Sequence, residues 1–137
     1  MIVVDTNVLS QPLRQDGERR VIAWLDAHDE QIRIRAQAIS QLVYGYEKLP
    51  FGRKRTELHG CVFALLTRCH DRILPFDRAA AEAHGWLIAK LKRQGLTPPF
   101  VDPQIAAIAI SRCATVATRN TDDFAPSELD LINPWAD

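Results

Sequence analysis

The stretch IVVDTNVLS, residues 2–10, decides the fold that we predict for this chain. Residues 2–4 are apolar and β-branched, and so short a run of such residues is typical of a buried strand. The next three residues, an aspartate, a threonine and an asparagine, are polar. Ligands of parallel sheets bind just beyond the carboxyl ends of the strands, so these polar residues stand where a binding site is expected.

Strands and helices alternate along the rest of the sequence. Besides residues 2–4, strands are predicted in QIRIR (31–35), RILPF (72–76), at 115–117 of ATVATRN and in LDLIN (129–133). Helices are predicted at about 18–30, 37–47, 53–69, 78–94 and 103–113. This alternation indicates an α/β fold, with a parallel sheet of about four to five strands flanked by helices in one three-layer domain, residues 1–137.

Breaker and capping residues set the limits of these elements. Asp77 is expected to cap the helix that follows it, and Gly95 to end that helix. SQPLRQDG (10–17) is predicted to be a loop, and LTPPFVD (96–102) a stiff, extended loop.

Composition narrows the class of protein. The 137 residues are 47% hydrophobic and 25% charged, and 17 basic side chains balance 17 acidic ones. A formal charge of zero argues against a protein that coats polyanions generally, but it is compatible with a nucleic-acid enzyme whose basic residues are local. No secretory leader and no membrane span is expected, because Asp5 interrupts the first apolar run and no apolar run is long enough.

The three cysteines, Cys61, Cys69 and Cys113, are odd in number and lack the spacing of a metal site. We therefore expect reduced thiols in the core of a cytoplasmic protein.

Polar residues far apart in the sequence should meet at one edge of this sheet. Asp5 follows the first strand, and Asn120, with Asp123 close behind, follows the strand at 115–117. Asp102 precedes a helix that starts at the same edge in such folds, and Gln41 lies in the first turns of the helix after the second strand.

Clustered carboxylates repel one another and must be protonated or neutralised by a cation. Carboxylate and amide oxygens suit Mg²⁺, with Mn²⁺ as an alternative. A hydrated ion can activate a water and offset the charge of a scissile phosphate, so the pattern favours phosphodiester hydrolysis. No serine or cysteine triad stands out, and the four histidines lie outside the cluster.

The same residues carry a resemblance to a known family. IVVDTNVLS, YGYEKLP, RILPFD, VDPQIAAIA, ATVATRNTDDF and INPW, in this order and at these intervals, resemble the PIN-domain ribonuclease toxins of the VapC and FitB-like type. The resemblance implies a parallel sheet with an acidic Mg²⁺ site at its carboxyl edge and endonuclease action on RNA. It also implies a homodimer and a cognate antitoxin that inserts a segment near the site.

Site residues follow from the resemblance position by position. Asp5 and Asp102 match the metal carboxylates, with Asp5 expected to be oriented by Thr6 and the neighbouring asparagine. Asn120 falls where relatives carry aspartate or asparagine, and Asp123 is a second candidate for the final acidic group.

Gln41 departs from the family pattern, because SQLVYG stands where relatives usually have a glutamate, as in AELxYG. The resulting set of catalytic candidates is Asp5, Gln41, Asp102, Asn120 and Asp123. Glutamine offers an oxygen but no charge, so metal binding should be weaker. Glu47 cannot replace the missing carboxylate, since six residues along a helix turn it to another side. A catalytically weakened PIN domain that acts mainly as an antitoxin-binding partner is therefore an alternative function.

Several candidates also have a purely structural interpretation. Asp5 and Asp102 could serve only as caps, and Asn120 only in a turn. Arg33 and Arg35 are expected on an exposed strand face, opposite Ile32 and Ile34, with contact between Arg35 and an RNA phosphate or an antitoxin carboxylate as the alternative.

Three further expectations concern side-chain packing and the class of enzyme. The helical pair at 37–66 could expose an apolar groove that binds the antitoxin. The tryptophans Trp24, Trp86 and Trp135 are expected to be packing residues. A haloacid-dehalogenase-type phosphatase is a weaker alternative, because it normally needs a second aspartate where Asn7 stands.

Overall fold

The computed structural model describes residues 1–96 and 102–136, and it has five parallel strands in one sheet. The strands are β1 (Ile2–Val4), β2 (Ile32–Arg35), β3 (Ile73–Leu74), β4 (Thr115–Ala117) and β5 (Leu131–Ile132). Their order across the sheet is β3-β2-β1-β4-β5, which places the first strand at the centre. The predicted parallel α/β fold is confirmed.

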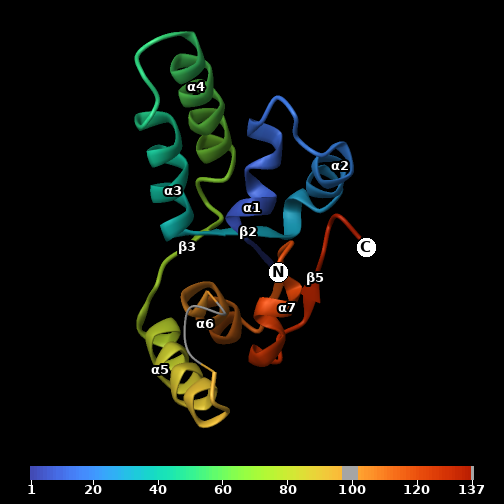
Figure 1. Cartoon of the computed structure of the whole chain (residues 1–137), viewed down its shortest axis with the longest axis vertical. Helices are drawn as coiled ribbons and strands as arrows, with labels where there is room; N and C mark the ends of the chain where they lie inside the picture. The colour runs from blue at the N-terminus through green and yellow to red at the C-terminus, as the bar shows by residue number, and fades with distance from the viewer. Residues whose placement is uncertain (97–101, 137) are drawn as a thin grey trace.

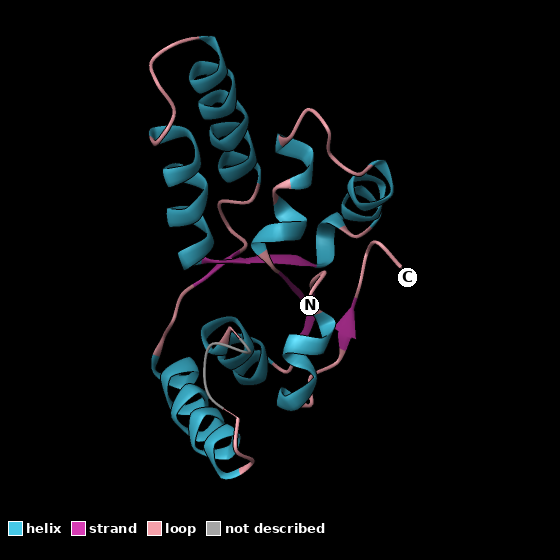
Figure 2. Ribbon diagram, in the orientation of Figure 1, coloured by secondary structure: helices cyan, strands magenta, loops and turns pink. Residues whose placement is uncertain are grey.

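Helices cover both faces of this sheet (Figures 1 and 2). The α-helices are α1 (Thr6–Leu9), α2 (Arg19–Ala27), α3 (Ala36–Glu47), α4 (Arg53–Arg68), α5 (Arg78–Arg93), α6 (Pro103–Arg112) and α7 (Thr121–Phe124). Short 3-10 turns are η1 (Gln11–Leu13), η2 (Asp29–Gln31) and η3 (Ala125–Ser127). Helices α1 to α4 lie on one side of the sheet, and α5, α6 and α7 on the other (Figure 1). None of the helices in the described ranges is long and apolar enough to cross a membrane.

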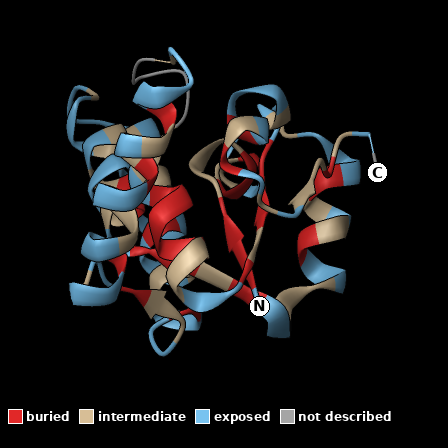
Figure 3. Cartoon of the chain, turned by 90° about the horizontal axis from the view of Figure 1, so that it is seen from below, coloured by how far each residue is buried: buried red, intermediate tan, exposed pale blue. Residues whose placement is uncertain are grey.

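Alternation along the strands divides the core in two. On β1, Ile2 and Val4 pack with the cluster under α1 to α4, whereas Val3 packs with the cluster under α5, α6 and α7. Such alternation is the period of two expected of a strand with both faces covered. Figure 3 shows the result, with buried residues concentrated on the strands and on the helix faces that meet them.

Two segments were predicted incorrectly near the strand ends. Residues 6–9 form α1 and residues 11–13 form η1, where the sequence predicted polar strand-end residues and a loop. Residues 121–124 form α7, where it predicted no helix. Four residues make one helical turn, which is too short to show a hydrophobic period. The predicted loop at 96–102 lies, for residues 97–101, outside the described residues.

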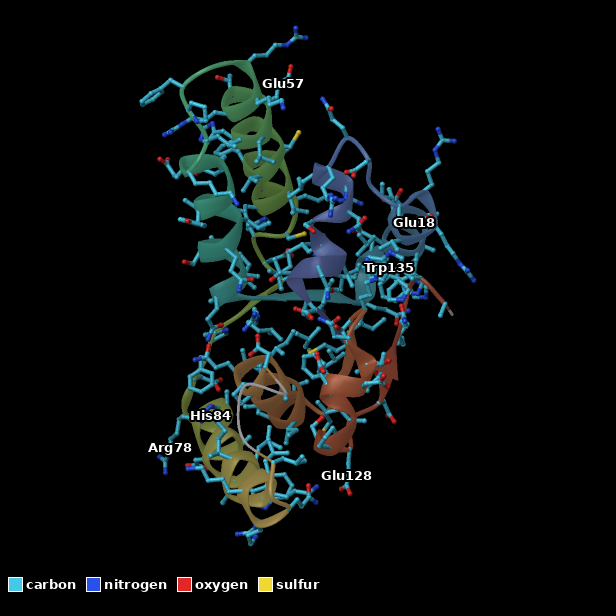
Figure 4. All side chains as sticks on the ribbon, in the orientation of Figure 1. Glu18, Glu57, Arg78, His84, Glu128 and Trp135 are labelled. Carbon is cyan, nitrogen blue, oxygen red and sulfur yellow. The ribbon has the colours of Figure 1, made fainter. Side chains whose placement is uncertain are left out.

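Some of the cysteines and tryptophans predicted to lie in the core are buried, and others are exposed. Cys69 is buried as predicted, and burial raises the pKa of its thiol, but Cys61 and Cys113 are exposed and the core prediction is wrong for them. Trp86 is also exposed, at 52% of its surface, and does not serve as a core residue. Trp24 and Trp135 do pack against the core, and Trp135 lies beside α2, where Arg20 donates a hydrogen bond of 3.0 Å to its carbonyl oxygen (Figure 4).

Asp77 caps α5 as predicted, and removing the cap should destabilise the protein. Its Oδ1 accepts a hydrogen bond of 3.0 Å from the backbone N–H of Ala80. We expect Asp77→Ala to lower the free energy of unfolding by about 1 kcal/mol, because that N–H loses its partner. Urea denaturation measures this change. Asp71→Ala is the control, since Asp71 is an exposed acid that caps no helix, and an equal loss in both variants would contradict the capping role.

Candidate functional site

An open depression lies at the carboxyl edge of the sheet, where the central strands end. Its volume is about 520 Å³. The lining residues are Asp5, Thr6, Asn7, Arg35, Gln41, Asp102, Pro103, Asn120, Asp123 and Phe124. All five predicted catalytic candidates are therefore brought together, although they come from four separate segments of the sequence. Their chemical roles stay predictions.

Asp5 is fixed in place by the end of its own strand and by its neighbour in the sheet. Its Oδ1 accepts a hydrogen bond of 2.8 Å from the backbone N–H of Thr6, which makes it the N-cap of α1. Its Oδ2 accepts another of 2.8 Å from the hydroxyl of Thr118. Both donors are neutral, so the carboxylate is oriented without losing its negative charge.

The predicted orienting groups were only partly right. Thr6 acts through its backbone N–H, and its hydroxyl donates instead to Gln41 Oε1. Asn7 Oδ1 is buried and has no hydrogen-bond partner in the described part of the chain. Thr118, which was given no role, orients Asp5, and strand register could have revealed this. Val4 pairs with Ala117, so the residues after them, Asp5 and Thr118, are neighbours.

Asp102 lies at the start of α6, where it is the N-cap residue. Its Oδ1 accepts hydrogen bonds of 3.1 and 3.2 Å from the backbone N–H groups of Gln104 and Ile105, so the predicted cap is confirmed. Its Oδ2 lies 2.8 Å from Nη2 of Arg35. Asp102 is thus a cap and one half of an ion pair at once.

Arg35 is buried, which corrects the expectation of an exposed strand face. Its side chain is 4% exposed and ends against Asp102, a carboxylate of the same chain. The face was predicted correctly, since Ile32 and Ile34 pack on the opposite side with α1 to α4. What was wrong was the predicted exposure of this face, because the start of α6 covers the end of β2. Arg33 stays half-buried and donates to the carbonyl oxygens of Glu30 and Ile32.

The remaining candidates are neutral or exposed. Gln41 is an exposed residue of α3 that accepts from the Thr6 hydroxyl. Asn120 precedes α7 and its N–H donates to the hydroxyl of Thr118 over 3.0 Å, while Asp123 lies one turn into that helix. Glu47 pairs with Arg55 at 2.7 Å and does not line the depression.

The donor set fits a hydrated hard cation better than a ready-made cage. Within residues 1–96 and 102–136, no group of three or more histidine, cysteine, aspartate or glutamate side chains comes close enough to hold a metal. The candidate ligands are nevertheless all oxygens, and the unpartnered Oδ1 of Asn7 lies among them. Magnesium keeps several of its waters and often binds through only one or two carboxylates. Asp5 and Asp102 match that mode.

Comparison with known proteins agrees with this architecture. The sequence profile of the PIN domain matches residues 2–126. The VapC ribonuclease Y4jK of Sinorhizobium fredii is 38% identical to the chain, and the match covers 98% of each protein. The toxin FitB of Neisseria gonorrhoeae is 37% identical, with 100% of each covered.

Solved structures share the fold. The crystal structure of FitAcB from Neisseria gonorrhoeae superposes with a TM-score of 0.91 at 36% sequence identity. The superposition covers 99% of each chain. The chain therefore shares its fold with a solved relative along nearly its whole length.

Proposed function

The chain belongs to the PIN-domain family, and from this membership we propose that it is a Mg²⁺-dependent endoribonuclease toxin of a toxin–antitoxin pair, with Mn²⁺ as a possible substitute. One observation carries the proposal, namely that Asp5, Gln41, Asp102, Asn120 and Asp123 line a single depression at the carboxyl edge of the sheet. The names of the relatives, a ribonuclease and a toxin, support the same reading.

Each residue has a defined task in the proposed reaction. Asp5 and Asp102 would hold the metal, which when bound would supply Lewis acidity and activate a water for attack on a phosphodiester. Thr118 and the Thr6 N–H fix the rotamer of Asp5, and the first turn of α6 fixes that of Asp102. Asn120, Asp123 and Gln41 line the same depression, where the first two would orient water of the ion and Gln41 would add a neutral contact.

The test is cleavage of RNA by the purified chain. We expect endonucleolytic products from an RNA substrate when Mg²⁺ or Mn²⁺ is present and none when EDTA removes it. We expect Asp123→Asn to cleave more slowly than the parent and Asp122→Asn, its control, to cleave at the parent's rate, since both residues are exposed on α7 but only Asp123 lines the depression. Cleavage that persists in EDTA would contradict the metal-dependent reaction.

An antitoxin site is proposed beside the catalytic depression. A groove of about 400 Å³ runs between α1, α3 and α4, and Thr6 and Gln41 line both it and the depression. Leu42, Leu49 and Leu58 give it an apolar wall, and the neighbouring Tyr44, Phe51 and Phe63 are exposed. A segment laid in this groove would reach Gln41 and the edge of the active site.

We also propose that the chain forms the homodimer expected from the resemblance. Measuring the molecular mass of the protein in solution tests this, because a homodimer has twice the mass of one chain.

A second candidate function is favoured by the low charge of the site. Gln41 and Asn120 are neutral, and Asp102 is already paired with Arg35. A PIN domain so weakened would act mainly by binding its antitoxin. Titration with Mg²⁺ separates the two candidates, because the weakened domain should bind the ion poorly and cleave nothing.

A further inference from the structure

Arg35 is a buried cation inside a depression that is proposed to hold a metal. It is the last residue of β2, its side chain is 4% exposed, and Nη2 contacts Asp102 Oδ2 at 2.8 Å. Its Nε is buried with no hydrogen-bond partner among the residues described. Within residues 1–96 and 102–136, the ion pair of this guanidinium is with Asp102, a proposed metal ligand.

The two proposed ligands differ in how their charge is used. Asp5 receives one neutral donor on each oxygen. Asp102 receives two backbone N–H groups on Oδ1 and the guanidinium on Oδ2, so its charge is neutralised by a full positive charge. A divalent ion that reached Oδ2 of Asp102 would have to displace or share the place of Arg35, since two cations so close repel each other.

The net charge of the depression also indicates that Arg35 weakens the binding of a divalent cation. Its lining contains three carboxylates, those of Asp5, Asp102 and Asp123, and one guanidinium, which leaves a net formal charge of −2. Without Arg35 the same lining would carry −3. Anionic ligands are the main source of affinity for hard cations, so the guanidinium lowers the affinity of this site.

We infer that Arg35 is the site's resident cation, a positioning residue that holds Asp102 through their ion pair and competes with the divalent metal for its Oδ2. Asp5 would then be the main ligand of the metal, and binding through Oδ2 of Asp102 would require the guanidinium to give up that oxygen. This inference rests on the proposed function, because it assumes that the depression binds a divalent ion.

Calorimetric titration of the full chain with Mn²⁺ tests the competition. We expect Arg35→Gln to bind Mn²⁺ at least about tenfold more tightly than the parent, the scale on which groups contacting a metal ligand change affinity. Arg33→Gln is the matched control, since it removes the same charge from the same strand but from a side chain bonded to Glu30 and Ile32. Its affinity should stay within about twofold of the parent, because surface charges are largely screened by salt.

The outcomes separate the inference from the function on which it rests. Equal affinity in Arg35→Gln and the parent, or weaker binding in Arg35→Gln, overturns the inference and leaves a metal-dependent nuclease intact. Absence of Mn²⁺ binding in both overturns the inference and the metal-dependent function together. A gain of the same size in Arg33→Gln would mean that net charge alone is responsible, which also overturns it.

A second measurement is made on the parent chain, and a variant serves only to identify the signal that is followed. In the parent, Mg²⁺ should shift the NMR signal of the Arg35 Nε–H, because the guanidinium leaves or shares Asp102 as the ion binds. Arg35→Lys identifies that signal, and the Arg33 Nε–H serves as the internal reference. An Arg35 signal that stays unchanged at a saturating Mg²⁺ concentration overturns the competition.

Discussion

Asp5→Asn should lower the rate of RNA cleavage by at least about a hundredfold, the scale of losing one group that stabilises developing charge at a reacting centre. Asp5 is the proposed ligand whose carboxylate accepts hydrogen bonds from two neutral donors, whereas Asp102 is paired with a guanidinium. Removing its charge leaves Asp102, already paired with Arg35, as the main remaining carboxylate for the ion. The metal should then be lost at ordinary concentrations of Mg²⁺.

Asparagine is the sharper substitution because it keeps the structural role of Asp5. Its oxygen can still accept from the Thr6 N–H, and asparagine is as good an N-cap as aspartate. The melting temperature should therefore stay close to that of the parent while cleavage, measured at several Mg²⁺ concentrations, falls. Asp77→Asn is the matched control, since Asp77 also caps a helix through Oδ1 but does not line the depression.

Two results would count against this role of Asp5. The site is misassigned if Asp5→Asn cleaves RNA at the parent's rate. A comparable loss in Asp77→Asn would point instead to a general effect of altering a helix cap.

The order of the elements could be read from the sequence because it depends on local patterns. The β-branched run at 2–4 and the strand at 115–117 were predicted with their exact limits. Asp102 was recognised as a cap because an aspartate before a proline and an apolar run marks a helix start. Knowing that parallel strands share a carboxyl edge was then enough to gather the site residues from distant positions.

The arrangement around Arg35 could not be read in the same way. The alternation of QIRIR gives the face on which Arg35 lies, but it does not say what covers that face. The cover is the first turn of α6, which is 67 residues further along the chain at Asp102 and reaches β2 only through tertiary packing. The exposure of Cys61 could not be predicted either, because a helical pattern does not say how much of the helix other elements cover. The spacing of Cys61 fits the apolar stripe of α4, yet only Val62 of that helix is fully buried.

Gln41→Glu should have the opposite effect to Asp5→Asn, namely a gain of about tenfold in RNA cleavage at limiting Mg²⁺, equivalent to about 1.4 kcal/mol. Gln41 lines the depression and accepts from the Thr6 hydroxyl through Oε1. Glutamate has the same shape and keeps this acceptor, so the substitution adds one negative charge with little change in packing. An added carboxylate favours a divalent ion, and the gain should shrink as Mg²⁺ approaches saturation.

The added charge should also be visible in stability, which tests the same cause without RNA. In the absence of metal, a fourth carboxylate in the depression should lower the melting temperature, because like charges repel. Saturating Mg²⁺ should raise the melting temperature of Gln41→Glu more than that of the parent, since tighter binding to the folded state stabilises it more. Ser40→Glu is the control, because it puts the same charge on the residue directly before Gln41 in α3, and Ser40 does not line the depression. If Gln41→Glu gains neither cleavage nor Mg²⁺ stabilisation over Ser40→Glu, charge at position 41 does not limit this site, and the weakness must be sought at Asn120 or in the pairing of Asp102 with Arg35.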